Sequence, residues 1–136
     1  MLIVDAGPLY AAAATRDQHH ERAVELLAGS ARPLLVPTLV VTEVSYLLSD
    51  RIGPHAELAF AGAVAAGELL VEPVPDSEWA RIAELTEQYL DLPLGMTDAS
   101  VVSLAERHGL DTIASFDHRH FATVRPRHVE RLTLVP

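Results

Sequence analysis

The sequence predicts an α/β fold of three layers, in which a parallel, five-stranded sheet lies between helices. Five short apolar segments rich in Leu, Ile and Val alternate with segments of helical character along the chain. None of the five alternates between apolar and polar residues, which is typical of parallel strands buried on both faces. A chain of 136 residues fits one hydrophobic core of ordinary size, so we expect a single domain over residues 1–136.

The expected strands are recognised by their length and their continuous apolar character. Each is too short for a helix, and the first two end directly at Asp5 and at Pro37. No repeat, linker or low-complexity segment separates them. The expected strands are 2–4, 34–36, 69–71, 112–114 and 132–135.

The expected helices are recognised by apolar residues at helical spacing and by residues that start or stop a helix. Asp17, Thr38 and Thr97 are expected N-caps of the second, third and sixth helices, while Gly29 and Gly109 are expected to end the second and the sixth. Proline suits the first position of a helix. The expected helices are one that begins at Pro8 and those over 19–28, 38–48, 54–66, 77–89 and 97–109.

The composition excludes several classes of protein. Nineteen acidic residues face ten basic ones, and the resulting charge of −9 counts against a simple nucleic-acid-binding module. All the basic residues are arginines, and the absence of lysine excludes P-loop, Schiff-base and phospho-acceptor receiver chemistry. The absence of cysteine excludes disulfides, thiolate metal sites and thiol nucleophiles.

No segment is expected to cross a membrane. The longest apolar stretches, 9–14 and 58–66, are well short of the roughly 20 residues that span a bilayer. The chain enters a strand at Leu2 without a preceding basic region, so no secretory signal is expected. We therefore expect a cytoplasmic protein.

Two acidic residues follow expected strands. Asp5 comes directly after the first strand, and Asp117 comes shortly after the fourth. In open parallel sheets, ligands bind at the carboxyl ends of the strands. We therefore expect both carboxylates at one site if these two strands are neighbours.

Two further acidic residues lie on expected helices among apolar residues. Val101, Val102 and Ala105 place Asp98 on the apolar stripe of its helix. Glu43 is expected in the middle of an apolar helix face. Its neighbours at helical spacing are Leu39, Val40, Tyr46 and Leu47.

A buried carboxylate needs a partner, because leaving it unpaired costs on the order of several kcal/mol of folding free energy. No arginine lies on the inner stripe of either helix. Oxygen ligands without cysteine favour Mg²⁺ or Mn²⁺ over zinc, and such a cation can activate water for attack on a phosphodiester. The sequence therefore indicates a metal site formed by Asp5, Glu43, Asp98 and Asp117.

Each of these acids also has a structural interpretation when taken alone. Asp98 could complement the dipole of its helix, and Asp5 and Asp117 could be turn residues. Glu43 is harder to explain in this way, because few glutamates have four apolar neighbours. The metal-site hypothesis depends on the four residues as a set.

Each of the four acids lies in a short sequence motif: Asp5 with Gly7-Pro8, Thr42-Glu43, Thr97-Asp98 and Ser115-Phe116-Asp117. In these motifs the sequence resembles PIN-domain ribonucleases, in particular the VapC-type toxins of bacterial VapBC toxin–antitoxin systems. The resemblance covers nearly the whole chain. The matching segments are 2–9, 17–27, 42–44, 97–109 and 115–121.

The resemblance implies a parallel five-stranded sheet, Mg²⁺-dependent endoribonuclease activity, a homodimer, and inhibition by a small VapB-type antitoxin that inserts into the active site. It also implies that Asp5, Glu43, Asp98 and Asp117 are the metal ligands. Gly7 departs from the pattern, because many members have Ser or Asn there, and we expect its backbone N–H to support Asp5 instead. His118 stands where some relatives carry another acid, which weakens the expectation of a second metal ion.

Basic and imidazole side chains are concentrated near the C-terminus. His118, Arg119 and His120 are expected on a loop that lines the groove for RNA, with a solvated loop as the alternative. A strand would instead place both histidines on one side, where they could bind zinc. The remaining arginines of this stretch, expected to contact phosphates in part, are Arg125, Arg127 and Arg131.

Two other functions remain open at this point. One is a catalytically silent PIN-like adaptor that binds RNA or protein. The other is a Mg²⁺-dependent phosphatase on a related α/β fold, although Asp5-Ala6-Gly7 lacks the Asp-x-Asp pattern of aspartyl-nucleophile phosphatases.

Overall fold

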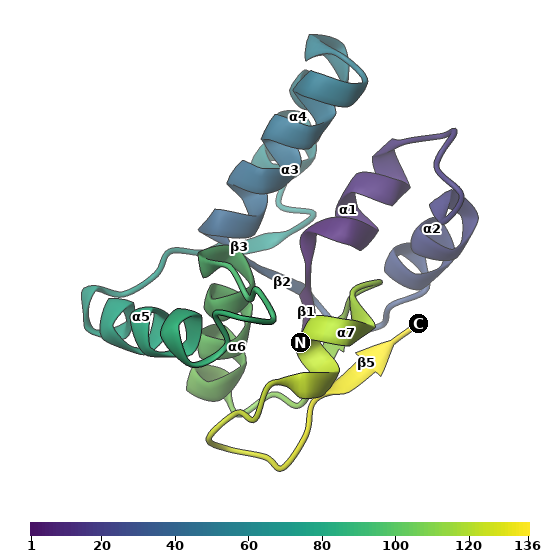
Figure 1. Cartoon of the computed structure of the whole chain (residues 1–136). Coiled ribbons are helices and arrows are strands. Elements are labelled where there is room, and N and C mark those ends of the chain that lie inside the picture. Colours follow the sequence, from purple (N-terminus) through teal and green to yellow (C-terminus); the bar gives the residue numbers. More distant parts are fainter.

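The computed structural model describes all residues, 1–136, and contains one five-stranded sheet in which every strand pair is parallel. The strand order is β3-β2-β1-β4-β5, so the first strand lies in the centre (Figure 1). The predicted fold class is therefore confirmed. The strands are β1 (Leu2–Val4), β2 (Leu34–Pro37), β3 (Leu70–Glu72), β4 (Thr112–Ala114) and β5 (Thr133–Val135).

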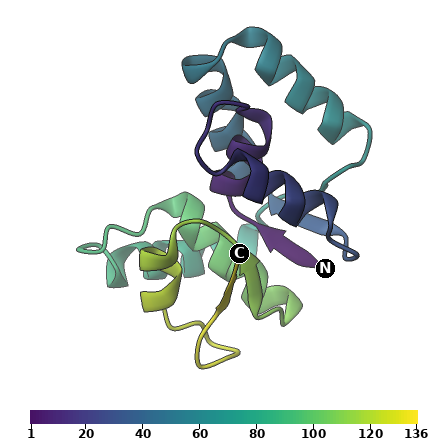
Figure 2. The same ribbon diagram turned by 90° about the vertical axis from the view of Figure 1, so that its right-hand side faces the viewer.

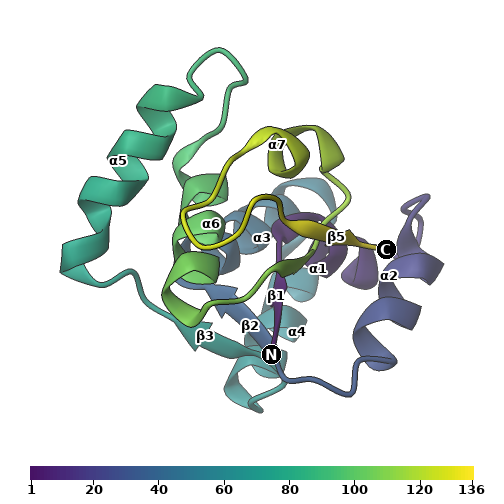
Figure 3. The ribbon, with the colours of Figure 1, turned by 90° about the horizontal axis from the view of Figure 1, so that it is seen from below.

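Helices cover both sides of the sheet. The four helices of the N-terminal half lie on one side of β1, and the last three lie on the other (Figure 2). The α-helices are α1 (Ala6–Ala13), α2 (His20–Ala28), α3 (Thr38–Arg51), α4 (Pro54–Ala65), α5 (Trp79–Gln88), α6 (Met96–His108) and α7 (His118–Thr123). A short 3₁₀ turn, Asp76–Glu78, precedes α5, which packs along α6 (Figure 3).

The hydrophobic core explains the absence of alternation in the strands. β1 is buried over its whole length, as are Ile113 and Ala114 of β4. Helix α6 contributes an almost continuous buried segment from Ala99 to Ala105. These elements fix the centre of the sheet, and with it the segments that follow β1 and β4. No helix is long and apolar enough to cross a lipid bilayer.

Several predicted helix starts were wrong. Thr38 and Thr97 lie inside α3 and α6, and neither caps its helix. Asp17 does not cap α2 directly; it accepts a hydrogen bond from the backbone N–H of His19, which is the N-cap residue. Helix α1 begins two residues before Pro8, because proline is tolerated throughout the first turn, where backbone N–H groups have no helical partner.

The sequence predicted the C-terminal end of α6 correctly but not the structure of the segment after β4. Gly109 ends α6 as predicted, in a left-handed conformation with φ of 64° that favours glycine. The prediction that residues 118–120 form a loop was wrong, because this segment is the first turn of α7. Phe121 anchors the short helix, since its side chain is completely buried.

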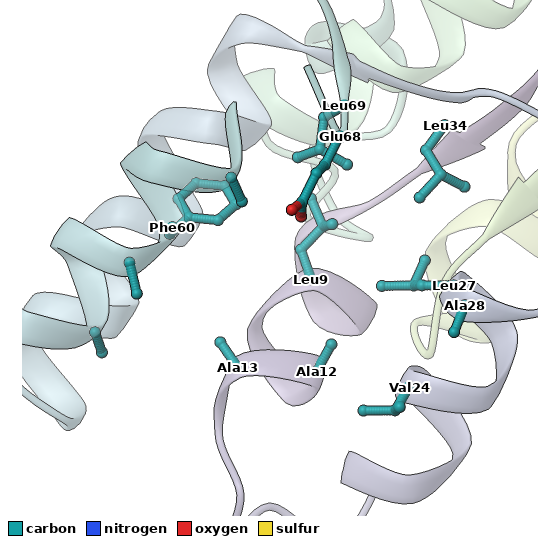
Figure 4. Close-up of a pocket in the computed structure, with 13 residues that line it drawn as sticks. Leu9, Ala12, Ala13, Val24, Leu27, Ala28, Leu34, Phe60, Glu68 and Leu69 are labelled. Carbon is teal, nitrogen blue, oxygen red and sulfur yellow. The ribbon is translucent and has the colours of Figure 1, made fainter. Parts of the chain in front are cut away.

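An apolar groove lies between α1, α2 and α4. It has a volume of about 540 Å³, and Glu68 is the only residue of its lining that is not hydrophobic. Leu9 and Ala12 of α1, Leu27 of α2 and Phe60 of α4 border the same space (Figure 4). Helix α4 projects away from the sheet (Figure 1).

Candidate active site

The carboxyl ends of the two central strands carry the first pair of acidic side chains. Asp5 directly follows β1 and is the N-cap residue of α1, and its side chain is 6% exposed. Asp117 follows β4 after two residues and is the N-cap residue of α7, where its Oδ1 accepts a hydrogen bond from the backbone N–H of His120. Because β1 and β4 are paired neighbours, the two carboxylates lie at the same edge of the sheet.

Ser115 connects these two acids. Its hydroxyl donates a hydrogen bond to Asp5 Oδ2 over 2.9 Å and accepts one from the backbone N–H of Asp117, also over 2.9 Å. The Ser115 side chain is completely buried, so water does not compete for either bond. Ser115, and not Gly7 as expected, therefore holds Asp5 in place. A Cβ atom at Gly7 would meet Phe116 only at ordinary contact distance, 3.5 Å.

Asp98 joins the cluster from the first turn of α6. Its Oδ2 lies 2.8 Å from Nδ1 of His120, and the same nitrogen lies 2.9 Å from Oδ2 of Asp117. One ligand atom from each of these three residues lies within 4.8 Å of the others, which is close enough for all three to contact one cation. The imidazole of His120 thus lies between two carboxylates.

Glu43 has a different environment from the one predicted. The buried stripe of α3 consists of Val40, Val44 and Leu48, so Glu43 lies beside this stripe on an exposed part of the helix. The prediction of an apolar surrounding was wrong, since its neighbour Tyr46 is 66% exposed. Glu43 nevertheless lies near enough to the site for the charge of Asp98 to raise the pKa of its carboxylate.

The electrostatics of the cluster disfavour several negative charges at once. Burial, reinforced by the charge of Asp98, raises the pKa of Asp5 from 3.8 to about 7. Although Glu43 as a residue is exposed, its carboxylate is partly removed from solvent. This desolvation raises the pKa of Glu43, and the charge of Asp98 raises it further. Burial also raises the pKa of Asp98, although the hydrogen bond to His120 opposes this shift. A cation placed among these groups would offset both the free-energy cost of burying charged carboxylates and the repulsion between them.

His120 is the residue whose position sequence reasoning missed. It was expected to line the substrate groove, but its ring contacts Asp98 and Asp117 instead. The available signal was its spacing, because a residue three positions after a helix N-cap returns to the same side of the helix. His118 and Arg119 are exposed on the first turn of α7. The alternative in which His118 and His120 bind zinc from a strand is wrong, because they lie in a helix.

The C-terminal arginines separate into two groups. Arg127 pairs with Glu84 over 3.1 Å, and its backbone N–H bonds to Glu106, so this residue fastens the C-terminal segment to α5 and α6. Arg119 and Arg131 are exposed and form no ion pair. The dense basic stretch of the sequence is therefore not one uniform cationic surface.

Comparison with known proteins decides the family. The PIN domain model matches residues 2–125. The chain belongs to the PIN domain family. Ribonuclease VapC26 of Mycobacterium tuberculosis is 33% identical over 135 residues, which cover 99% of this PIN chain and all of the relative.

Solved structures share the PIN fold. The crystal structure of Mycobacterium tuberculosis VapC20, described as a Sarcin-Ricin loop cleaving toxin, matches with a TM-score of 0.81 and 21% identity, over 87% of this chain and 91% of that one. VapBC2 from Rickettsia felis, bound to a DNA fragment from its promoter, has a TM-score of 0.67 at 15% identity and covers 98% of this chain and 96% of that one. DNA-bound VapBC from Salmonella typhimurium has a TM-score of 0.65 at 14% identity, with 99% and 98% covered.

Proposed function

We propose that this PIN protein is a Mg²⁺-dependent endoribonuclease and the toxin component of a type II toxin–antitoxin system in the cytoplasm. The observation that carries the proposal is the carboxylate cluster at the carboxyl ends of β1 and β4, in a chain similar over its full length to a ribonuclease. Asp5, Asp98 and Asp117 come from three different elements. Each has a local hydrogen-bond partner, but burial and the neighbouring carboxylates still raise the pKa of Asp5 and of Asp98, a cost that a bound cation would offset.

The donor set fits a divalent cation. Asp5, Glu43, Asp98 and Asp117 would hold Mg²⁺, and Mn²⁺ could substitute, because hard cations prefer carboxylate oxygen. The cation would lower the pKa of an attacking water and neutralise the charge that develops on the phosphodiester. Nδ1 of His120 is within reach of the oxygens of Asp98 and Asp117, so this imidazole either becomes a further ligand or moves when the cation binds.

The remaining residues of the site position these carboxylates and the substrate. Ser115 keeps Asp5 oriented through a buried hydrogen bond. Arg119 and His118, exposed on the first turn of α7 next to Asp117, would contact RNA phosphates and so offset the acidic character of the chain.

A VapB-type antitoxin is the partner that we propose for the apolar groove between α1, α2 and α4. Two of the structural neighbours are VapBC complexes. The groove offers an almost purely hydrophobic lining, which fits the apolar face of an amphipathic helix. We further propose that the toxin forms a homodimer, as expected from the family resemblance.

The two alternative functions make different predictions in one assay. Labelled single-stranded RNA and a small phosphate ester are each incubated with the protein in Mg²⁺, in Mn²⁺ and in chelator. The ribonuclease cleaves only RNA, only with metal, and leaves 5′-phosphate ends, because water rather than the 2′-hydroxyl attacks. An adaptor cleaves neither substrate, and a phosphatase cleaves the ester. Products with 2′,3′-cyclic phosphate would refute the proposed mechanism, since they require an acid–base pair.

A further inference from the structure

A ring stack lies directly beside the carboxylate cluster. Phe116, the residue between Ser115 and Asp117, packs against His19 at the start of α2, with ring centroids 4.4 Å apart and an angle of 19° between the rings. The guanidinium carbon of Arg22 lies 5.7 Å from the centroid of the same phenyl ring. An aromatic surface and a positive charge therefore occur together next to the candidate site.

These side chains have capacity left for a ligand. Phe116 and His19 are only partly buried, and Arg22 is exposed. The imidazole of His19 makes no hydrogen bond; its backbone N–H donates to Asp17 and its backbone carbonyl accepts from Ala23. Arg22 forms no ion pair, although the chain is strongly acidic. A ligand with a flat ring and a negative charge would use both of these features.

We propose that the His19–Phe116 stack, together with Arg22, binds one nucleotide of single-stranded RNA next to the phosphodiester that is cleaved. This inference rests on the proposed ribonuclease function. The base adds a third ring to the stack, because every nucleobase presents a π face, and the guanidinium of Arg22 contacts a phosphate.

The position of the stack determines which nucleotide it holds. Phe116 is the covalent neighbour of Asp117 and follows Ser115, which bonds to Asp5, so a base held here belongs to a nucleotide adjacent to the metal-binding carboxylates. Stacking strength grows with the size of the ring system, so a purine is preferred over a pyrimidine at this position. The stack thus contributes to both affinity and choice of cleavage site.

Fluorescence of 2-aminopurine tests the stack without requiring cleavage, since this base loses fluorescence when it stacks. A short single-stranded RNA carries the probe at one position at a time. It is titrated with the full chain bearing Asp5→Asn, which keeps the RNA intact in Mg²⁺. Asn is nearly isosteric with the aspartate and can still accept the Ser115 hydrogen bond, so the fold is preserved. We expect quenching at one position.

Four further variants in this background assign the quenching. His19→Ala is expected to abolish it and to weaken binding by about 5- to 150-fold, the range for loss of one base–aromatic stack. His19→Phe keeps an aromatic ring and retains the quenching. His55→Ala removes an exposed histidine from α4 and changes nothing. Phe116→Leu keeps apolar volume in the fold and should still lose the quenching.

The outcomes that overturn the inference are specific. Equal quenching and affinity in His19→Ala and His55→Ala would mean that the stack serves only to hold α2 on the segment after β4. Absence of quenching at every RNA position would refute the stack as well. A wild-type protein that cleaves no RNA refutes the proposed function instead, and the fluorescence result then decides the stacking inference independently.

Discussion

Nδ1 of His120 lies 2.8 Å from Oδ2 of Asp98, so an imidazole occupies the space beside a carboxylate that a cation would otherwise contact. The same nitrogen is 2.9 Å from Asp117. His120 therefore serves as the partner of two carboxylates from different elements, Asp98 in α6 and Asp117 in the segment between β4 and α7.

Removing this imidazole should show whether His120 competes with the metal ion or binds it. His120→Ala removes the imidazole from Asp98 and Asp117 and leaves Asp117 only the backbone N–H of residue 120, so we expect lower stability in chelator, by about 1–3 kcal/mol. Because Mg²⁺ prefers oxygen ligands, the ring competes with it, and the variant should bind Mg²⁺ more tightly by calorimetry. Weaker Mg²⁺ binding would show instead that His120 is a ligand. His108→Ala, which removes a histidine that contacts Glu72, is the control.

The raised pKa of Asp5 predicts an unusual pH dependence of stability in the absence of metal. With a pKa of about 7 in the folded protein against 3.8 ordinarily, the folded state keeps a proton that the unfolded state has lost. Stability in chelator should therefore fall as pH rises from about 4 to about 7, by at most about 4 kcal/mol. Asp5→Asn should remove most of this slope in urea titrations.

Asp91→Asn is the matched control for Asp5, because Asp91 is exposed and its variant should keep the wild-type pH profile. Saturating Mg²⁺ should flatten the wild-type profile, since the cation stabilises the charged carboxylate. A profile of Asp5→Asn identical to that of wild type would contradict the assignment of the raised pKa to Asp5.

Ser115 should be required for both stability and cleavage. Ser115→Ala leaves Asp5 Oδ2 and the backbone N–H of Asp117 without their buried partner, at a cost of about 1–3 kcal/mol. RNA cleavage should fall more steeply than stability accounts for, because Asp5 loses its orientation. Ser103→Ala removes another buried hydroxyl, which bonds to Glu78, and should retain activity. Equal activity of both variants would mean that Ser115 is only structural.

Arg119 and Arg127 should respond differently to salt. We expect Arg119→Ala to weaken RNA binding and to reduce the slope of log K against log salt by about 0.7, the value for one phosphate contact on a single strand. Arg127→Ala should leave RNA binding unchanged, because its guanidinium already pairs with Glu84, and should lower the melting temperature slightly. Identical salt slopes for both variants and wild type would remove Arg119 from the RNA surface.

The apolar groove should be required for the antitoxin and not for cleavage. Ala59→Arg places a charge in the lining of the groove, so binding of the protein encoded by the neighbouring reading frame should be lost in calorimetry. Leu58→Arg changes the next residue of α4, which is 68% exposed and outside the lining, and should bind normally. If both variants bind equally well, the antitoxin uses another surface.

The strands and long helices could be predicted from the sequence because they depend on burial, which leaves a continuous apolar pattern. The neighbouring position of β1 and β4 followed only conditionally, since strand order is not encoded in any single segment. The starts of the helices were harder to predict from the sequence. Thr38 shows why, since its hydroxyl donates to the backbone of Glu72 in a neighbouring strand rather than to its own helix.

The sequence indicated the carboxylates of the candidate site, but it did not indicate that the imidazole of His120 contacts Asp98 and Asp117. The position of His120 depends on α7, a helix of six residues that is too short to produce a recognisable apolar period. Glu43 was misplaced for the opposite reason, because its helix carries more apolar residues than it buries, as the exposed Tyr46 illustrates. Contact between His19 and Phe116 joins segments nearly a hundred positions apart, and no local pattern indicates it.

The central position of β1 between β2 and β4 has a consequence for protein synthesis. Ser115, which follows β4, lies 110 positions after Asp5 in the chain, so Asp5 is synthesised well before β4, Ser115 and Asp117. A nascent chain, or a fragment truncated before β4, holds Asp5 at an open sheet edge with no neighbour to complete the cluster. The growing polypeptide therefore remains without its full set of carboxylates until β4 and Asp117 have been translated and have joined β1.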